Sequence, residues 1–405
     1  MPEPGMFPPT RQAALERLAG FLPAAGRAYA EGRNLDPGPG EPTAVSGLSP
    51  YLRHRVITEA EVVDAVLQTH GLAGADKFIQ EVLWRTYWKG WLEMRPSVWS
   101  RFLETRDRER DGLVDEQALA DAEAGRTGVE GFDDWARELA RTGYLHNHAR
   151  MWFASIWIFT LRLPWALGAD LFLRRLVDAD PASNTLSWRW VAGLQTPGKT
   201  YLATRENIAR FTGGRFAPTG LATEAPALAE APALAEAPPE PPAGLPPAAD
   251  SPPPGPFLLL ATPEDLAPDL GGIDPAAAAA AVVTADPRLS LGEASSRFAA
   301  GAASDAADRL AGRMQGPVTL MDRLDADALV AAAQGAQVRT LVTPYAPVGP
   351  TADALAQTAQ ALQAEGLRLI QVRRDWDSRF WPHATAGFFA FRKQIPALLD
   401  PERAR

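Results

Sequence analysis

At 405 residues, 46% of them hydrophobic, the chain is long enough for two domains that each bury a core, which excludes a single small module. The absence of cysteine excludes disulfides, thiolate metal sites and thiol catalysis. The formal net charge of −9 excludes a uniformly basic nucleic-acid coat, although residues 1–216 are close to neutral and can still present a local basic face to phosphates.

The longest apolar run, residues 151–161, is too short to span a bilayer and is followed at once by Arg162. The first residues lack the basic-then-apolar pattern of a signal peptide. We therefore expect a soluble, cytoplasmic monomer with no membrane partner.

Residues 1–216 are predicted to form an all-α domain, because apolar residues recur there at helical spacing and alternating strands are absent. Most of the twelve tryptophans also lie before residue 217. Such an enrichment indicates a flat-ring ligand or a stacking surface, with plain hydrophobic core as the alternative.

The first chemically informative helix is predicted over residues 78–88. In it Glu81, Trp84 and Arg85 share one face, so that one stripe carries acid, indole and base. The alternative is a simple i,i+4 salt bridge between Glu81 and Arg85 on a half-buried helix.

A second such helix is predicted to begin near Leu145, with Asn147, Arg150 and Met151 on a common face. His146 and His148 are only two residues apart and diverge, whereas a helical metal pair needs i,i+4 spacing. We therefore expect no metal.

The third segment runs from Asp178 to Trp190. Asp180 followed by Pro181 predicts an N-cap and a helix start, after which Asn184 and Trp188 lie one turn apart. Capping by solvent-exposed aspartates is the alternative for this pair of acids.

Residues 217–255 are an Ala/Pro-rich stretch that predicts a semi-rigid linker. Beyond it, residues 256–405 alternate short strand-like runs with Ala-rich helical stretches, which predicts a doubly wound, Rossmann-like α/β domain. The predicted strands are 257–261, 282–284, 318–321, 340–343 and 367–372.

Five ordered motifs resemble those of the photolyase/cryptochrome family. They are Tyr29-Ala-Glu-Gly-Arg33, Val45-Ser-Gly-Leu-Ser-Pro-Tyr-Leu52, Glu81-x-x-Trp-Arg85, Thr142-Gly-Tyr-Leu-His-Asn147, and Asp178-x-Asp180 with Asn184, Trp188 and Trp190.

The resemblance implies FAD as cofactor, without a glycine-rich phosphate loop. Its phosphates and ribityl chain would contact Tyr29, Ser46, Leu48 and Ser49. Arg85 and Arg150 would supply positive charge near the cofactor. Asp178 and Asp180 would form hydrogen bonds with it, and Asn184 would face flavin N5.

The resemblance also implies electron supply to the photoexcited flavin through Trp188 and Trp165, the inner and middle members of a tryptophan chain. The outer tryptophan is missing, because its position falls near the small residue Ala122. Candidates to replace it are Trp99, Trp135, Trp152 and Trp157.

On the substrate side, the resemblance implies a deoxyribodipyrimidine photolyase-like lyase that acts on UV-damaged DNA. Reduced FAD, excited by blue light, would donate an electron to a flipped-out cyclobutane pyrimidine dimer. Glu81 and Asn147 would stabilise the dimer through hydrogen bonds, while the other residues around it would be Trp84, Met151 and Trp190.

Several positions depart from the family pattern. His148 stands where an arginine usually contacts the lesion phosphate, Val45 replaces a threonine, and Arg55 replaces a common glycine. The segment 206–216 matches the family's C-terminal motif only in part, so a final helix layer could be lost.

The order of the domains departs as well, because the family's α/β antenna domain normally precedes the FAD domain. Residues 256–405 loosely resemble that domain, moved to the C-terminal side, and another doubly wound module is the alternative. Whether it binds a second, antenna chromophore is left open.

Three other functions are alternatives to this one. A cryptochrome-like blue-light sensor would keep FAD and the tryptophans without repair turnover, and His148 favours it. A (6-4) photolyase is disfavoured, because histidines are expected where Asn147 and Met151 stand. A decayed homologue is disfavoured by the retained polar residues.

Overall fold

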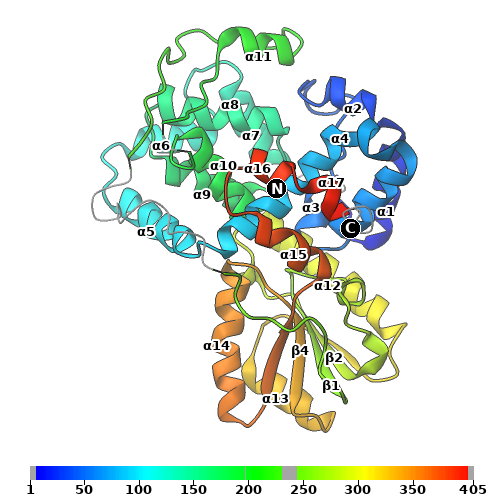
Figure 1. Ribbon diagram of the computed structural model, residues 1–405. Helices are drawn as coiled ribbons and strands as arrows, with labels where there is room; N and C mark the ends of the chain where they lie inside the picture. The colour runs from blue at the N-terminus through cyan, green and yellow to red at the C-terminus, as the bar shows by residue number, and fades with distance from the viewer. Residues whose placement is uncertain (1–5, 197, 230–243, 400–405) are drawn as a thin grey trace.

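The computed structural model describes residues 6–196, 198–229 and 244–399, and shows a helical half packed on an α/β half (Figure 1). The middle of the predicted linker, residues 230–243, lies outside the described residues. Its described flanks lie against the protein: the amide of Leu228 donates to the carbonyl of Ala192, and Ala249 pairs with Val372 beside the sheet. The domain limits at residues 216 and 256 stay a prediction.

In its described part, the helical half contains helices and no strand, as predicted. Local signals start several of them: Thr58 and Glu61 form a capping box, and Asp180 caps the helix that begins at Pro181. The helices are α1 (Arg11–Phe21), η1 (Leu22–Ala24), α2 (Arg27–Gly32), α3 (Ser49–Arg53), α4 (Glu59–Glu93), α5 (Ser97–Asp111), α6 (Glu116–Ala124), α7 (Phe132–Thr142), α8 (Asn147–Ser155), the π-helical turn η2 (Ile156–Thr160), α9 (Trp165–Arg175), α10 (Pro181–Val191) and α11 (Arg205–Phe211).

The α/β half has a five-stranded parallel sheet in the order β3-β2-β1-β4-β5, which confirms the doubly wound prediction. Its strands are β1 (Phe257–Ala261), β2 (Ala278–Thr284), β3 (Val318–Met321), β4 (Thr340–Pro344) and β5 (Arg368–Val372). The helices after β1 are η3 (Pro268–Gly271), η4 (Pro275–Ala277), η5 (Pro287–Leu289), α12 (Glu293–Ala311), α13 (Ala326–Gly335), α14 (Pro350–Ala364), α15 (Asp375–Phe380), η6 (Trp381–His383), α16 (Phe388–Arg392) and α17 (Ile395–Leu399).

The two faces of the sheet pack differently. Alternate residues of β1 point to opposite faces: Leu258 and Leu260 belong to a core shared with α13 and α14, while Leu259 packs in a core that includes α12 and the helical half. One hydrophobic core therefore runs through both halves. After β5, the chain returns along the helical half through α15 to α17 (Figure 1).

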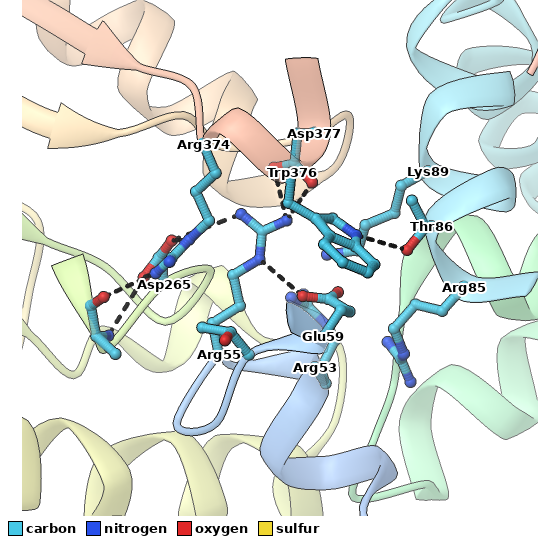
Figure 2. A network of polar contacts seen from close by, with 12 residues as sticks. Arg53, Arg55, Glu59, Arg85, Thr86, Lys89, Asp265, Arg374, Trp376 and Asp377 are labelled. Atoms are coloured by element: carbon cyan, nitrogen blue, oxygen red, sulfur yellow. Dashed lines mark hydrogen bonds and ion pairs between the residues drawn. The ribbon is translucent and has the colours of Figure 1, made fainter. Parts of the chain in front are cut away.

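Ion pairs between the halves are buried at the carboxyl ends of the strands (Figure 2). Arg53 forms two hydrogen bonds with Glu264, of 2.5 and 2.6 Å, just beyond β1. Beyond β4, the hydroxyl of Tyr345 donates to the Glu93 carboxylate at 2.7 Å, and burial raises the pKa of Glu93 to about 7. Doubly wound domains usually bind ligands in this crevice, and here side chains of the helical half occupy it.

Arg55 has a left-handed backbone, with φ 47°, which explains why glycine is common at this position. Its guanidinium lies 2.7 and 2.8 Å from the two carboxylate oxygens of Asp377 in α15, and within 4 Å of Glu59 and Asp265. Burial alone would lower the pKa of Arg55, but these carboxylates outweigh it and raise the pKa. The altered residue therefore serves the interface between the halves.

Among the helices of the described residues, none combines the length and the apolar character needed to cross a membrane.

Candidate functional site

A cavity of about 700 Å³ opens in the helical half between α4, α8 and α10. Its size is typical of a ligand pocket. The cavity is lined by fifteen of the sixteen side chains predicted to form the site: Tyr29, Ser46, Leu48, Ser49, Glu81, Trp84, Arg85, Asn147, Arg150, Met151, Asp178, Asp180, Asn184, Trp188 and Trp190. Residues from five separate sequence segments thus converge on one cavity.

The segment 46–49 supplies hydroxyls and a tight turn at one end of the cavity. The amide of Leu48 donates to the Ser46 hydroxyl at 3.3 Å, and α3 begins at Ser49. Gly47 has φ 62°, and a Cβ there would lie 2.8 Å from Nη1 of Arg17. Glycine is therefore favoured at this turn on conformational grounds, whereas the flexible end of Arg17 could move aside from a Cβ.

Arg150 and Asp178 form a two-fold ion pair that lines the cavity. Nη1 and Nη2 of Arg150 lie 3.2 and 3.1 Å from the two carboxylate oxygens of Asp178. Burial pushes the pKa of Asp178 upwards, but Arg150, Ser49 and Arg85 outweigh it, so the pKa stays below its usual value. This aspartate is thus an ionised hydrogen-bond acceptor near neutral pH.

Asp180 is the second buried acceptor. It caps α10 by accepting from the Ser183 amide at 2.7 Å, and it pairs with Nη1 of Arg85 at 2.8 Å. Lys89 and Arg53 lie within 4 Å. Burial acts to raise the pKa of Asp180, and the surrounding cations lower it far more. The capping alternative is therefore correct for Asp180, but both aspartates are buried and not exposed.

On the next turn of α10, Asn184 is fixed by a hydrogen bond from its Nδ2 to the carbonyl of Ala169, at 2.8 Å. Ser183 also lines the cavity, and its buried hydroxyl has no hydrogen-bond partner among the described residues. Sequence reasoning missed Ser183. Its place three residues after the cap is the signal that could have indicated it.

Glu81 and Arg85 do not form the i,i+4 salt bridge that was the alternative for this helix. The carboxylate of Glu81 pairs with Arg33, the residue that follows α2, while Arg85 pairs with Asp180. Burial raises the pKa of Glu81, and Arg33 counteracts part of that rise. Arg33 lines the cavity as well, and it stands in the first quoted motif without having been assigned a role.

Two half-buried indoles, Trp84 from α4 and Trp190 from α10, contribute aromatic surface to the cavity. Trp190 stacks on Tyr201, with ring centroids 5.6 Å apart and an interplanar angle of 27°. Tyr201 also lines the cavity, and sequence reasoning did not select it.

Trp188 lies on the cavity wall, whereas Trp165 is buried at the start of α9 and does not line it. The ring of Trp157 lies against Trp188, with centroids 6.3 Å apart. Gly168 allows this approach, because a Cβ there would lie 2.4 Å from Trp188 and 2.8 Å from Trp157. Trp157 is therefore a candidate for the next member of a relay, beside Trp165, which the resemblance implies.

His148 is an interior residue. Its ring stacks on Trp152, with ring centroids 4.2 Å apart, and its Nδ1 lies 3.0 Å from the carbonyl oxygen of Asn34. Burial lowers the pKa of His148, so the imidazole is neutral near pH 7. It therefore provides no charge for a phosphate.

Comparisons with known proteins agree with the motifs. Residues 78–217 match the family described as the FAD binding domain of DNA photolyase. A deoxyribodipyrimidine photo-lyase of Streptomyces griseus is 38% identical over 154 residues, which cover 38% of this chain and 33% of that protein. One from Thermus thermophilus is 34% identical over 220 residues, or 54% of this chain and 50% of that protein.

Two solved structures are also similar. A class III photolyase from Agrobacterium tumefaciens has a TM-score of 0.45 at 30% identity, covering 51% of this chain and 44% of that one. A cryptochrome from Synechocystis sp. PCC6803 has a TM-score of 0.43 at 22% identity, covering 50% and 43%. The match thus spans a third to a half of each curated relative.

Proposed function

We propose that this chain, whose helical half is related to the FAD-binding domain of DNA photolyases, binds FAD and uses blue light to split cyclobutane pyrimidine dimers in DNA. One observation carries the proposal: a single cavity is lined both by the residues expected to hold FAD and by those expected to hold the lesion. The substrate follows the name of the relatives, deoxyribodipyrimidine photo-lyase.

The residues present fit FAD. Ser46 and Ser49 offer hydroxyls for its phosphates, the buried and ionised Asp178 offers an acceptor, and the unpartnered Ser183 hydroxyl is available to a ligand. Arg85 and Arg150 keep the carboxylates ionised and bring positive charge to an anionic cofactor. When bound, FAD would supply the light-driven electron that opens the dimer.

The dimer would be held by the aromatic and polar residues of the same cavity. Trp84 and Trp190 present flat apolar rings on which flipped bases can stack. Glu81 and the exposed Asn147 are placed to hydrogen-bond the polar edges of the bases, and Met151 completes the wall.

The proposal is tested by the absorption spectrum of the purified protein, followed by reduction, addition of a dimer-containing oligonucleotide and blue illumination. We expect bound FAD and light-dependent loss of dimers, with none lost in the dark. Saturating FAD should also stabilise the fold, by about 2.7 kcal/mol at a hundred times its Kd. A protein that stays colourless after FAD is added would overturn the proposal.

A light sensor is the second candidate, favoured by the buried and neutral His148. A repair enzyme should bind irradiated thymine tracts more tightly than intact ones, with an affinity that falls as salt rises. A sensor should make no such distinction. Photoreduction without preference for irradiated DNA would favour the sensor.

We expect Trp188→Phe to abolish reduction of the bound flavin in light while leaving repair by chemically reduced protein intact. The ring centroids of Trp188 and Phe172 lie 5.2 Å apart, and a phenylalanine at position 188 keeps this aromatic packing. Phenylalanine is, however, much harder to oxidise than tryptophan. The measurement is flavin absorbance during illumination with an external reductant. Trp157→Phe and Trp165→Phe would then show which ring is the next donor.

Trp91→Phe is the control for these variants, because Trp91 is equally buried but does not line the cavity. Normal photoreduction in Trp188→Phe would remove this residue from the electron path.

A further inference from the structure

Phe388, the first residue of α16, stacks face to face on Trp84. The ring centroids lie 3.6 Å apart with an interplanar angle of 12°, and Phe388 is 5% exposed. Phe388 itself does not line the cavity that Trp84 lines. A residue that follows the last strand of the α/β half thus supports a wall of the site in the helical half.

Several contacts fix α16 on this side of α4. The hydroxyl of Tyr87 donates to the carbonyl of Ala386 at 2.6 Å, two residues before α16 begins. At its other end, Arg392 pairs with Asp76 at 3.2 Å, and Phe391 packs against Tyr87 at 5.5 Å. Figure 1 shows α16 lying with the helical half, away from the sheet. The ring of Phe388 is therefore held in place by three further anchors.

The indole of Trp84 needs such support, because it is only half-buried and one face must stay free for a base. Its neighbours on α4 meet it at an angle: Trp88 is tilted by 37° and Tyr87 lies edge-on at 84°. Phe388 is nearly parallel to it and so fixes the plane of the ring. On the other aromatic wall, Tyr201 stacks on Trp190 in a similar way.

We propose that Phe388 is a positioning residue for substrate, which holds Trp84 in the plane on which a pyrimidine base stacks. The inference rests on the proposed function. The segment after the last strand thereby supports the lesion side of the cavity from behind.

The test uses Phe388→Leu, which keeps apolar volume under Trp84 but removes the flat ring, and Phe388→Tyr, which restores it. Dark binding of each full-length protein to a dimer-containing oligonucleotide and to its undamaged counterpart is measured together with FAD content. We expect Phe388→Leu to bind the dimer roughly 3- to 10-fold more weakly, the range of an aromatic pair, and Phe388→Tyr to bind normally. FAD content and binding to undamaged DNA should not change.

Phe389→Ala is the matched control: it is the adjacent phenylalanine of the same helix, but 76% exposed. It should bind the dimer as the wild type does. Loss of FAD or of the cooperative thermal transition in Phe388→Leu would overturn the inference in favour of a purely structural role, and unchanged dimer binding would overturn it outright. A wild type without preference for the dimer would reject the proposed substrate, and this inference with it.

Discussion

Arg55→Gly is expected to lower the free energy of unfolding by roughly 1–4 kcal/mol, even though glycine suits the backbone at this position better. Removing one partner of a buried ion pair costs about 3–5 kcal/mol, because the remaining charge is left without compensation. Relief of the left-handed backbone, φ 47°, returns about 1–2 kcal/mol. The loss predominates because Asp377 and Glu59 would both stay buried without this cation.

Chemical denaturation of the full-length protein measures this effect, and Arg162→Gly is the matched control. Arg162→Gly is the same substitution at nearly the same backbone angle, φ 55°, but the side chain of Arg162 is exposed. The control should raise the free energy of unfolding by about 1–2 kcal/mol, because it relieves the same left-handed backbone without uncovering a buried charge.

A double-mutant cycle with Asp377→Asn isolates the contact across the interface. We expect the two substitutions to be non-additive by roughly 0.5–3 kcal/mol, because they remove the same ion pair. If Arg55→Gly behaves like Arg162→Gly, and the cycle is additive, the buried network does not hold the halves together.

The sheet shows how far local sequence determines structure. Strands β1 and β3 have the predicted bounds, because each is a short run rich in strand-forming residues between turn residues. Strand β2 begins at Ala278, four residues before the predicted start, inside a run of alanines that favours helix by propensity. Pairing with β1 and β3 on its two sides decides the outcome there, and such pairing has no local signature.

Local sequence also predicted which residues line the cavity, but it did not predict which of their charged side chains form ion pairs with one another. Residues one turn apart on a helix share a face, so Glu81, Trp84 and Arg85 could be placed on one stripe. The partner of Glu81 is Arg33, which is 48 residues away in the sequence. The ion pairs between the halves join residues more than 200 positions apart, such as Arg53 and Glu264. No periodicity relates such residues, so only the folded structure shows which charges meet.

The second large effect concerns Glu81. We expect Glu81→Ala to lower repair turnover by about 10²- to 10³-fold, the effect of removing one hydrogen-bond donor aimed at developing negative charge. A carboxyl group donates only when it is protonated, and burial raises the pKa of Glu81 towards the range where this is possible. Glu81→Gln keeps a donor of similar shape and should retain most of the turnover. Glu31→Ala, an exposed acid near Arg33 in the sequence, is the control and should leave turnover unchanged.

The pH dependence of repair turnover also tests whether Glu81 donates a hydrogen bond, because it predicts the direction in which turnover changes with pH. The donor is present below the pKa of Glu81 and is lost as pH rises through it, so turnover per bound dimer should fall on the alkaline side. Arg33 lowers the pKa of Glu81, and Arg33→Met should therefore move the alkaline limb to higher pH. Glu81→Gln should remove this limb, because an amide does not titrate. A wild-type profile identical to that of Glu81→Gln would show that Glu81 acts as an ionised partner of Arg33 and donates no proton to the substrate.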